Sequence, residues 1–95
     1  MLYDGFDLDS GNLAKCLSHG VSLAEIEALF RGRVVVVMDA EINGERRLHA
    51  CGRVEGRWIF CAFTWRGRRI RPVSVRYMHQ KEIRRYAEKI SELDD

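Results

Sequence analysis

The sequence predicts a small α+β domain in which helices cover one face of a four-stranded antiparallel sheet. Helix-capping signals occur near the start and the end of the chain, and four segments rich in β-branched and aromatic residues lie between them. Short connections separate these segments, which favours antiparallel neighbours joined as a meander. The length of 95 residues suits one core, so we expect residues 1–95 to form a single domain.

Two short helices open the predicted fold. Asp9 or Ser10 can cap a first helix that continues to about Ser18. Residues 22–25 read S-L-A-E, a capping box in which the serine and glutamate side chains each bond the other residue's backbone N–H. A second helix is therefore expected over residues 23–30.

Four strands follow the helices. Residues 34–38 read V-V-V-V-M, a β-branched run that is typical of a buried strand. Residues 43–44 are Asn-Gly, the dipeptide that most favours a tight hairpin turn. Further strands are expected over 47–54, 57–65 and 69–76.

The fourth strand contains Pro72, which lacks a backbone N–H and is tolerated best at a sheet edge. Successive side chains of a strand alternate between its two faces. Alternation places Arg69 and Arg71 on one side and Arg76 on the opposite side, where the strand meets the last helix.

The last helix is predicted over residues 80–93, with an apolar face and a basic face. The apolar face carries Ile83, Tyr86, Ala87 and Ile90, and the basic face carries Lys81, Arg84, Arg85 and Lys89.

Charge is distributed unevenly along the chain, although the net charge is only +2. Residues 1–45 carry three Lys or Arg against eight Asp or Glu, a net −5, whereas residues 46–95 carry thirteen against six, a net +7. Eleven of those thirteen are Arg, whose planar guanidinium binds phosphate and stacks on bases. The second half thus carries either a nucleic-acid-binding face or a solvated, arginine-rich surface.

Other classes of protein are disfavoured. No apolar run approaches the ~18 residues that cross a bilayer, and the N-terminus lacks the basic segment and apolar core of a secretory signal. Cys16, Cys51 and Cys61 lack CxxC spacing, which fits reduced thiols in the cytosol and not a disulfide framework or a zinc site. No metal-ligand or phosphate-cradling motif is found, so we expect no cofactor. Together with the missing apolar run and the cysteine pattern, this predicts a cytoplasmic protein that contacts no membrane.

Three histidines are the candidate proton carriers. His19 precedes Gly20, which ends the first helix; His49 lies inside a strand; and His79 takes the N-cap position three residues before Glu82. Each one, taken singly, is explained better by a structural role than by catalysis.

RNA carries its own nucleophile, the 2′-OH, so a protein can cleave it with a base, a cationic clamp and an acid. Arginine clusters interleaved with Trp58, Trp65 and Tyr77 can supply both the clamp and base stacking. The alternative role for these tryptophans is core packing, which is favoured more for Trp58 than for Trp65 beside the turn.

Five segments, taken in order, carry a further signal. They read F-D-L-D-S-G-N, S-H-G-V-S-L-A-E-I, E-R-R-L-H-A-C-G-R, R-G-R-R-I-R-P-V-S-V-R and K-E-I-R-R-Y, and they span roughly residues 6–86. This ordered set resembles the BrnT toxins, which belong to the RelE-like ribonuclease toxins of bacterial type II toxin–antitoxin systems. The resemblance implies a RelE-like fold and an RNA-cleaving toxin that inhibits translation. It also implies a BrnA-like antitoxin with a ribbon-helix-helix domain, and a complex that contacts DNA through that antitoxin to repress its own promoter.

The resemblance rests on four short motifs and has one notable departure. Ser18 stands where the family usually has Lys, which removes a possible phosphate clamp. The matched positions are His19 and Gly20 of K-H-G-V, Arg47 and Gly52 of R-x-x-x-x-G, Arg71, Ser74 and Arg76 of R-x-I-S-A-R, and Glu82 and Tyr86 of E-x-x-x-Y.

We therefore predict an endoribonuclease that cleaves RNA by metal-independent attack of the 2′-OH. Arg76 is the predicted main phosphate clamp, assisted by Arg47 and Arg53; His19 or Glu82 moves protons, and Tyr86 orients the site. The alternative is a catalytically weak or inactive toxin homologue that acts as an antitoxin- or RNA-binding module; a transcription factor is disfavoured because no helix-turn-helix can be found. The predicted RNA-binding residues are Arg53, Arg69, Arg71, Trp65, Lys81 and Arg84.

Overall fold

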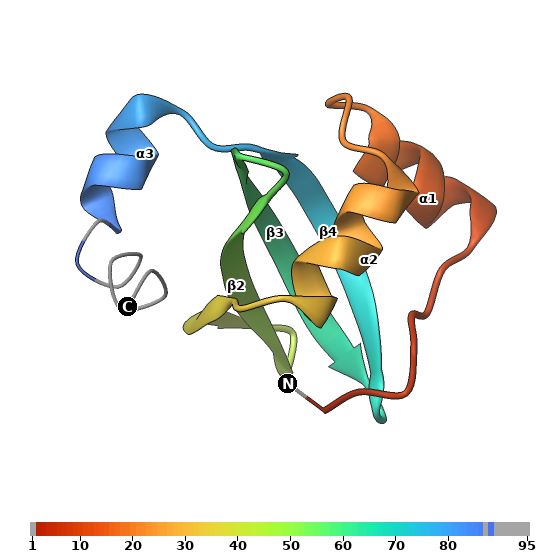
Figure 1. Ribbon diagram of the computed structural model, residues 1–95. Helices are drawn as coiled ribbons and strands as arrows, with labels where there is room; N and C mark the ends of the chain where they lie inside the picture. Colours follow the sequence, from red (N-terminus) through yellow and green to blue (C-terminus); the bar gives the residue numbers. More distant parts are fainter. Residues whose placement is uncertain (1, 87, 89–95) are drawn as a thin grey trace.

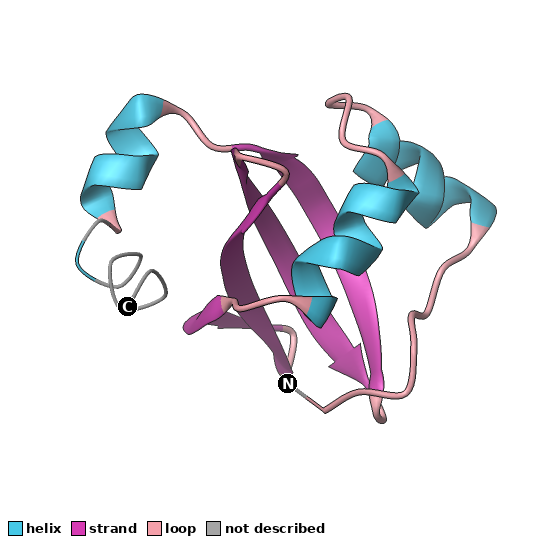
Figure 2. Ribbon diagram, in the orientation of Figure 1, coloured by secondary structure: helices cyan, strands magenta, loops and turns pink. Residues whose placement is uncertain are grey.

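The computed structural model describes residues 2–86 and residue 88, and it shows the predicted α+β fold (Figure 1). Four antiparallel strands form one sheet in the order β1-β2-β3-β4 (Figure 2). The elements are α1 (Ser10–Leu17), α2 (Leu23–Arg31), β1 (Val35–Ile42), β2 (Glu45–Val54), β3 (Arg57–Arg66), β4 (Arg69–Tyr77) and α3 (Gln80–Arg85). The last helix was predicted over residues 80–93, but α3 ends at Arg85 with Tyr86 as its C-cap; Ala87 and residues 89–93 of the prediction, Ile90 among them, lie outside the described residues.

The local signals in the sequence act as expected. Asp9 caps α1, because its carboxylate accepts a hydrogen bond from the backbone N–H of Asn12 at 2.7 Å. Ser22 and Glu25 form the capping box that begins α2. The Asn43-Gly44 turn has positive φ at both residues, as a tight hairpin between β1 and β2 requires.

One face of the sheet, which we call the covered face, lies beneath α1 and α2 (Figure 1). Ile59, Cys61 and Phe63 of β3 are fully buried on this face. The Phe30 ring of α2 meets the Phe63 ring edge to face, with centroids 5.2 Å apart. The buried residues of this main core are Cys16, Val21, Ile26, Leu29, Phe30, Ala50, Ile59, Cys61, Phe63, Ile70 and Val75.

Gly52 of β2 allows α2 to approach the covered face closely. A Cβ atom at this position would lie 2.7 Å from the Leu29 Cδ1 atom and 3.0 Å from the Arg33 carbonyl oxygen. Glycine is therefore required here by space rather than by backbone conformation.

The opposite face, which we call the open face, carries α3 at one end; among the described helices α3 alone packs on it (Figure 1). There, Ile83 and Tyr86 pack against a small cluster of Cys51, Phe60 and Met78. Residues directly opposite on antiparallel strands share a face, so the strand register and alternation define the rest. On the last three strands, the open face comprises Arg47, His49, Cys51 and Arg53 of β2, Trp58, Phe60, Ala62, Thr64 and Arg66 of β3, and Arg69, Arg71, Ser74 and Arg76 of β4.

A β-bulge at Val73 overturns the prediction that Arg76 faces away from Arg69 and Arg71. Strict alternation puts positions 71 and 76 on opposite faces, but the β3–β4 register shifts between the Ala62–Ser74 pair and the Phe63–Pro72 pair. Val73 is the extra residue in this shift, so Arg71 and Arg76 lie on the same face. Arg69, Arg71, Ser74 and Arg76 of β4 therefore meet on the open face.

β4 is an edge strand of the four-stranded sheet, as Pro72 indicates, but the N-terminal segment borders its first half. The N–H of Ile70 donates to the Gly5 carbonyl at 3.0 Å, and the N–H of Asp7 donates to the Ile70 carbonyl at 2.9 Å. Phe6 makes a single parallel bridge to Ile70 at this border. None of the described helices is both long and apolar enough to cross a membrane.

Candidate functional site

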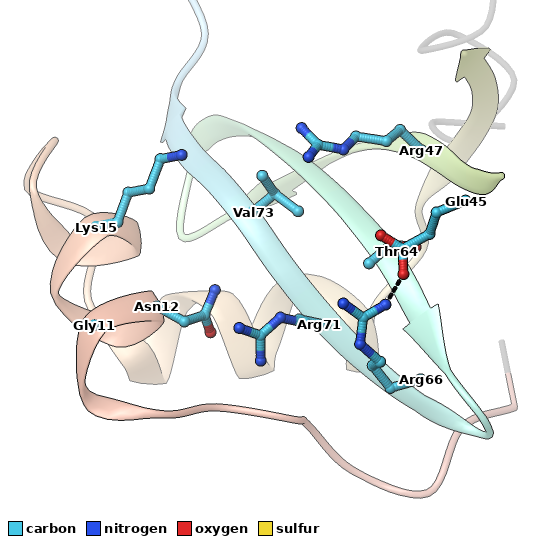
Figure 3. Close-up of a pocket in the computed structure, with 9 residues that line it drawn as sticks. All are labelled: Gly11, Asn12, Lys15, Glu45, Arg47, Thr64, Arg66, Arg71 and Val73. Carbon is cyan, nitrogen blue, oxygen red and sulfur yellow. Dashed lines mark ion pairs between the residues drawn. The ribbon is translucent and has the colours of Figure 1, made fainter. Parts of the chain in front are cut away.

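A cavity of about 300 Å³ lies where α1 borders the β4 edge of the open face (Figure 3). One wall comes from α1 and the other from β2 and β3, with the bulge residue Val73 between them. We call this cavity the basic pocket. It is lined by Gly11, Asn12, Lys15, Glu45, Arg47, Thr64, Arg66, Arg71 and Val73.

The four cations of the basic pocket fall into two groups. Arg66 forms an ion pair with Glu45 across the β3 and β2 ends (Figure 3), and Arg71 is paired with acids of the N-terminal segment. Neither Lys15 nor Arg47 makes a side-chain hydrogen bond or ion pair within the described part of the chain. Lys15 and Arg47 face one another across the pocket and are therefore available to an anionic ligand.

Arg71 is held in the pocket wall by Asp7 and Asp9. Its guanidinium lies 3.5 Å from the Asp7 carboxylate and 3.1 Å from the Asp9 carboxylate. The pKa of Asp9 is lowered, first by the hydrogen bond from the Asn12 N–H and then by the hydrogen bond from Arg71. The same carboxylate therefore caps α1 and orients Arg71.

A second polar cluster lies on the open face at the junction of β4 and α3. Arg76 forms a hydrogen-bonded ion pair with Glu82, and its guanidinium stacks 4.5 Å from the centre of the Phe60 ring. The hydrogen bond from Arg76 is the main reason that the pKa of Glu82 is lowered, and the same bond raises the pKa of Arg76. Glu82 also accepts a hydrogen bond from the His79 N–H at 3.1 Å, which anchors the start of α3. Tyr86 lies near this pair, and its electrostatic interaction with Arg76 also raises the pKa of the guanidinium.

The structure thus brings Arg76, Glu82 and Tyr86 together, with Arg47 on the same face. His19 does not join them: it is exposed in the α1–α2 loop, in the helical layer next to the covered face. In the same region, Tyr77 donates a hydrogen bond to Glu25 at 2.8 Å.

The predicted RNA-binding residues also separate into groups. Trp65, for which core packing was less expected than for Trp58, packs against the main core on the covered face, because its strand partner is the buried Ile70. Trp58 is the tryptophan of the open face, where the Arg53 guanidinium lies 5.5 Å from its ring centre. The remaining predicted residues are exposed: Arg69 at the start of β4, and Lys81 and Arg84 on α3.

Sequence reasoning left Lys15, Thr64 and His49 out of the site. Alternation along E-R-R-L-H-A-C-G-R already places His49 on the same face as Arg47, and that signal was available. Lys15 carries no such signal, because its place in the pocket depends on how α1 docks beside β4.

The three cysteines are free and buried. Burial raises the pKa of Cys51 to about 11 and also raises the pKa values of Cys16 and Cys61. These thiols are therefore poor nucleophiles. Among the described residues, no group of three or more His, Cys, Asp or Glu is arranged to hold a metal ion.

A small α+β domain that gathers cations from one helix and three strands around one sheet face has the charge arrangement that is typical of proteins that bind polyanions. Within this class, the family of ribonuclease toxins named BrnT, of type II toxin–antitoxin systems, matches residues 9–82. The chain therefore belongs to the BrnT family, whose target is RNA and whose partner is a protein antitoxin. The matched span includes the basic pocket, Arg76 and Glu82. No curated protein matches the chain.

Proposed function

We propose that this chain is a single-domain endoribonuclease toxin of the cytoplasm that cleaves RNA on its open face without a metal ion and thereby inhibits translation. The observation that carries the proposal is the bulge at Val73. Because of the bulge, the basic pocket and the Arg76 cluster lie on one face instead of two. A single RNA strand can therefore contact both.

The proposed reaction uses the nucleophile that RNA itself contains. The 2′-oxygen loses its proton and attacks the adjacent phosphorus, the bond from phosphorus to the 5′-oxygen breaks, and that oxygen takes a proton. The products are a 2′,3′-cyclic phosphate and a free 5′-OH. Guanidinium groups stabilise the extra negative charge of the pentavalent transition state.

Arg76 is the proposed clamp for that charge. It is half-buried, with 32% of its side chain exposed, and the Phe60 ring fixes the plane of its guanidinium. Glu82 neutralises it in the absence of RNA, so a phosphate must compete with this carboxylate or bind the remaining guanidinium N–H groups. The lowered pKa of Glu82 disfavours it as a proton acceptor and favours a role in orienting Arg76.

Lys15 offers a replacement for the lysine that the family usually has at position 18. Ser18 is exposed at the end of α1, where its hydroxyl donates to the Lys15 carbonyl at 2.7 Å. Lys15 lies about one helical turn earlier and lines the basic pocket. We propose that Lys15, Arg47 and Arg71 together bind a backbone phosphate there.

The proposed antitoxin is a BrnA-like ribbon-helix-helix protein, and only the complex contacts DNA. An acidic or amphipathic segment of the antitoxin complements the cations of the open face and blocks RNA. Co-expression is expected to relieve growth arrest and to inhibit cleavage in the purified complex. A stable complex that still cleaves RNA at the free toxin's rate would contradict direct blocking of the open face.

Cleavage of single-stranded RNA in EDTA tests the metal-independent chemistry. Wild-type protein is expected to cleave, and Arg76→Ala to lower kcat by about 10²–10³ because the lost contact acts mainly in the transition state. Arg85→Ala, an exposed arginine of α3 outside the predicted RNA-binding set, is the matched control. Activity that disappears in EDTA and returns with Mg²⁺ would overturn the metal-independent mechanism.

A second candidate function is a non-catalytic module that binds RNA or antitoxin. The neutralisation of Arg76 by Glu82 and the serine at position 18 favour it. It would be supported if the wild-type protein bound RNA and antitoxin tightly yet cleaved no RNA under any metal condition.

A further inference from the structure

The centre of the open face, between the two polar clusters, carries a row of three residues with the small Ala62 in the middle. His49, Ala62 and Ser74 lie side by side on β2, β3 and β4, since Ala62 pairs with both of its neighbours. Ala62 is much smaller than Phe60 and Thr64, which precede and follow it on the same face of β3. With strands about 4.8 Å apart, His49 and Ser74 stand roughly 10 Å from each other across this alanine.

Two cationic groups flank this row of residues along the strand direction. Arg47 precedes His49 by two residues, about 6–7 Å along β2, and belongs to the basic pocket. On the other side, two side chains contact the Phe60 ring. The His49 ring meets it edge to face with centroids 4.5 Å apart, and the Arg76 guanidinium stacks 4.5 Å from its centre. Phe60 therefore fixes the imidazole close to the proposed clamp.

We infer that His49 is a catalytic residue of the proposed ribonuclease, the base that takes the proton from the attacking 2′-OH; the inference rests on the proposed function. As the imidazole accepts this proton, the 2′-oxygen forms its bond to phosphorus and the 5′-oxygen leaves. The leaving oxygen takes a proton from water, and His49 returns its proton to solvent, so the enzyme is restored. RNA and water supply every atom of this reaction.

The other two histidines lie in different elements. His19 is in the α1–α2 loop, and His79 is the exposed N-cap of α3. Neither belongs to the strands that form the open face. They are matched controls for a substitution at His49.

The groups that face His49 bear on its pH dependence. Arg47 and the Cys51 thiol flank it on β2, Arg76 of β4 stacks on the Phe60 ring that His49 contacts, and Glu82 of α3 pairs with Arg76. From β1, the residue paired with His49 is the uncharged Val37. Histidine is the side chain whose charge ordinarily changes between about pH 5 and 8, so a catalytic base of this type makes the rate rise with pH in that range.

The test compares His49→Gln with His19→Gln and His79→Gln in single-turnover cleavage at saturating RNA across that pH range. We expect His49→Gln to lower the rate by roughly 10²–10⁴ and to abolish the rise with pH, while the two controls keep the wild-type profile. Binding of an RNA that carries 2′-deoxy substitutions, which cannot be cleaved, should be unchanged. A His49→Gln protein that cleaves at the wild-type rate with the wild-type pH profile overturns the inference and leaves the proposed function standing.

A measurement on the wild-type protein tests the role of His49 without the need for a stably folded variant. Addition of the 2′-deoxy-substituted RNA should shift the NMR signals of the His49 ring and leave those of His19 unchanged. An unshifted His49 signal at saturating RNA overturns the inference. Wild-type protein that cleaves no RNA overturns the proposed function itself, and the role of His49 with it.

Discussion

On the covered face, β3 presents Ile59, Cys61 and Phe63, none of which is exposed. On the open face, the same strand presents Phe60, Ala62 and Thr64 between two groups of cations. These three positions exclude charge because their side chains lose all contact with water beneath α1 and α2. The open face gathers charge because only one end of it lies under a described helix.

The acids that balance the open face come from its rim rather than its centre. Asp7 and Asp9 precede or cap α1, Glu45 begins β2, and Glu82 is in α3. A polyanion can replace such rim carboxylates without disturbing the core on the other side of the sheet. We therefore expect substitutions on the covered face to alter stability and substitutions on the open face to alter RNA binding or cleavage.

The largest effect expected from this comparison is loss of stability in Gly52→Ala, on the covered face. The new Cβ would lie 2.7 Å from the Leu29 Cδ1 atom, so α2 must move away from β2. Such overpacking typically costs about 1–3 kcal/mol. The free energy of unfolding in urea should fall accordingly, while the folded variant binds RNA with wild-type affinity.

Gly32→Ala is the control for this substitution. At Gly32 the nearest atom to a new Cβ is the Ala28 carbonyl oxygen at 3.5 Å, so the side chain has room. Its stability should equal or slightly exceed that of the wild type. The close approach of α2 to β2 would be refuted by a Gly52→Ala protein as stable as Gly32→Ala.

Most of the fold could be predicted from the sequence because each element carries a local signal. The caps at Asp9 and Ser22 and the Asn43-Gly44 turn acted where they were expected. The bulge could not be predicted, since nothing about Val73 distinguishes it from an ordinary strand residue. That one extra residue reverses the face assignment of Arg76 relative to Arg71.

Only part of the candidate site could therefore be predicted from the sequence. Arg76, Glu82 and Tyr86 are neighbours in sequence at a strand–helix junction, so their grouping follows from local structure. Lys15 reaches the basic pocket only through the docking of α1 against β4, a contact between segments far apart in sequence. His19 was chosen for its motif, and His49 was left out although strand alternation places it on the same face as Arg47.

A smaller effect, on RNA binding alone, is expected for Lys15→Ala and Arg47→Ala. Each removes one cation from the basic pocket, so the slope of log affinity against log salt should decrease in magnitude by about 0.7 per lost phosphate contact. Affinity should fall for all RNA sequences alike, since phosphate contacts carry no sequence information. Binding measured at several salt concentrations gives both quantities.

Arg31→Ala, an exposed arginine at the end of α2 in the helical layer, is the control for the salt series. It should leave the salt slope unchanged. An equal decrease for Arg31→Ala and Arg47→Ala would show that RNA binding follows overall charge and not the open face.

The smallest effect concerns the ion pair between Glu82 and Arg76, tested by Glu82→Gln. The glutamine can still accept the hydrogen bond from the His79 N–H, so the substitution removes mainly the charge. The two side chains are 21% and 32% exposed, so the pair should contribute only about 0.5–1 kcal/mol to stability at pH 7. Thermal melts with Glu41→Gln, an exposed carboxylate of β1, as the control should detect this difference.

The pH dependence of that difference identifies its origin. Arg76 lowers the pKa of Glu82 in the folded protein below the ordinary value of 4.5, so the folded state binds this proton less readily than the unfolded state. The stabilisation is complete above about pH 5 and is lost as the pH falls through the lowered pKa. The wild type and Glu82→Gln should therefore differ at pH 7 and converge in strong acid. A stability difference that stays constant down to the acid limit would show that Glu82 acts through packing, and that Arg76 is not held by its charge.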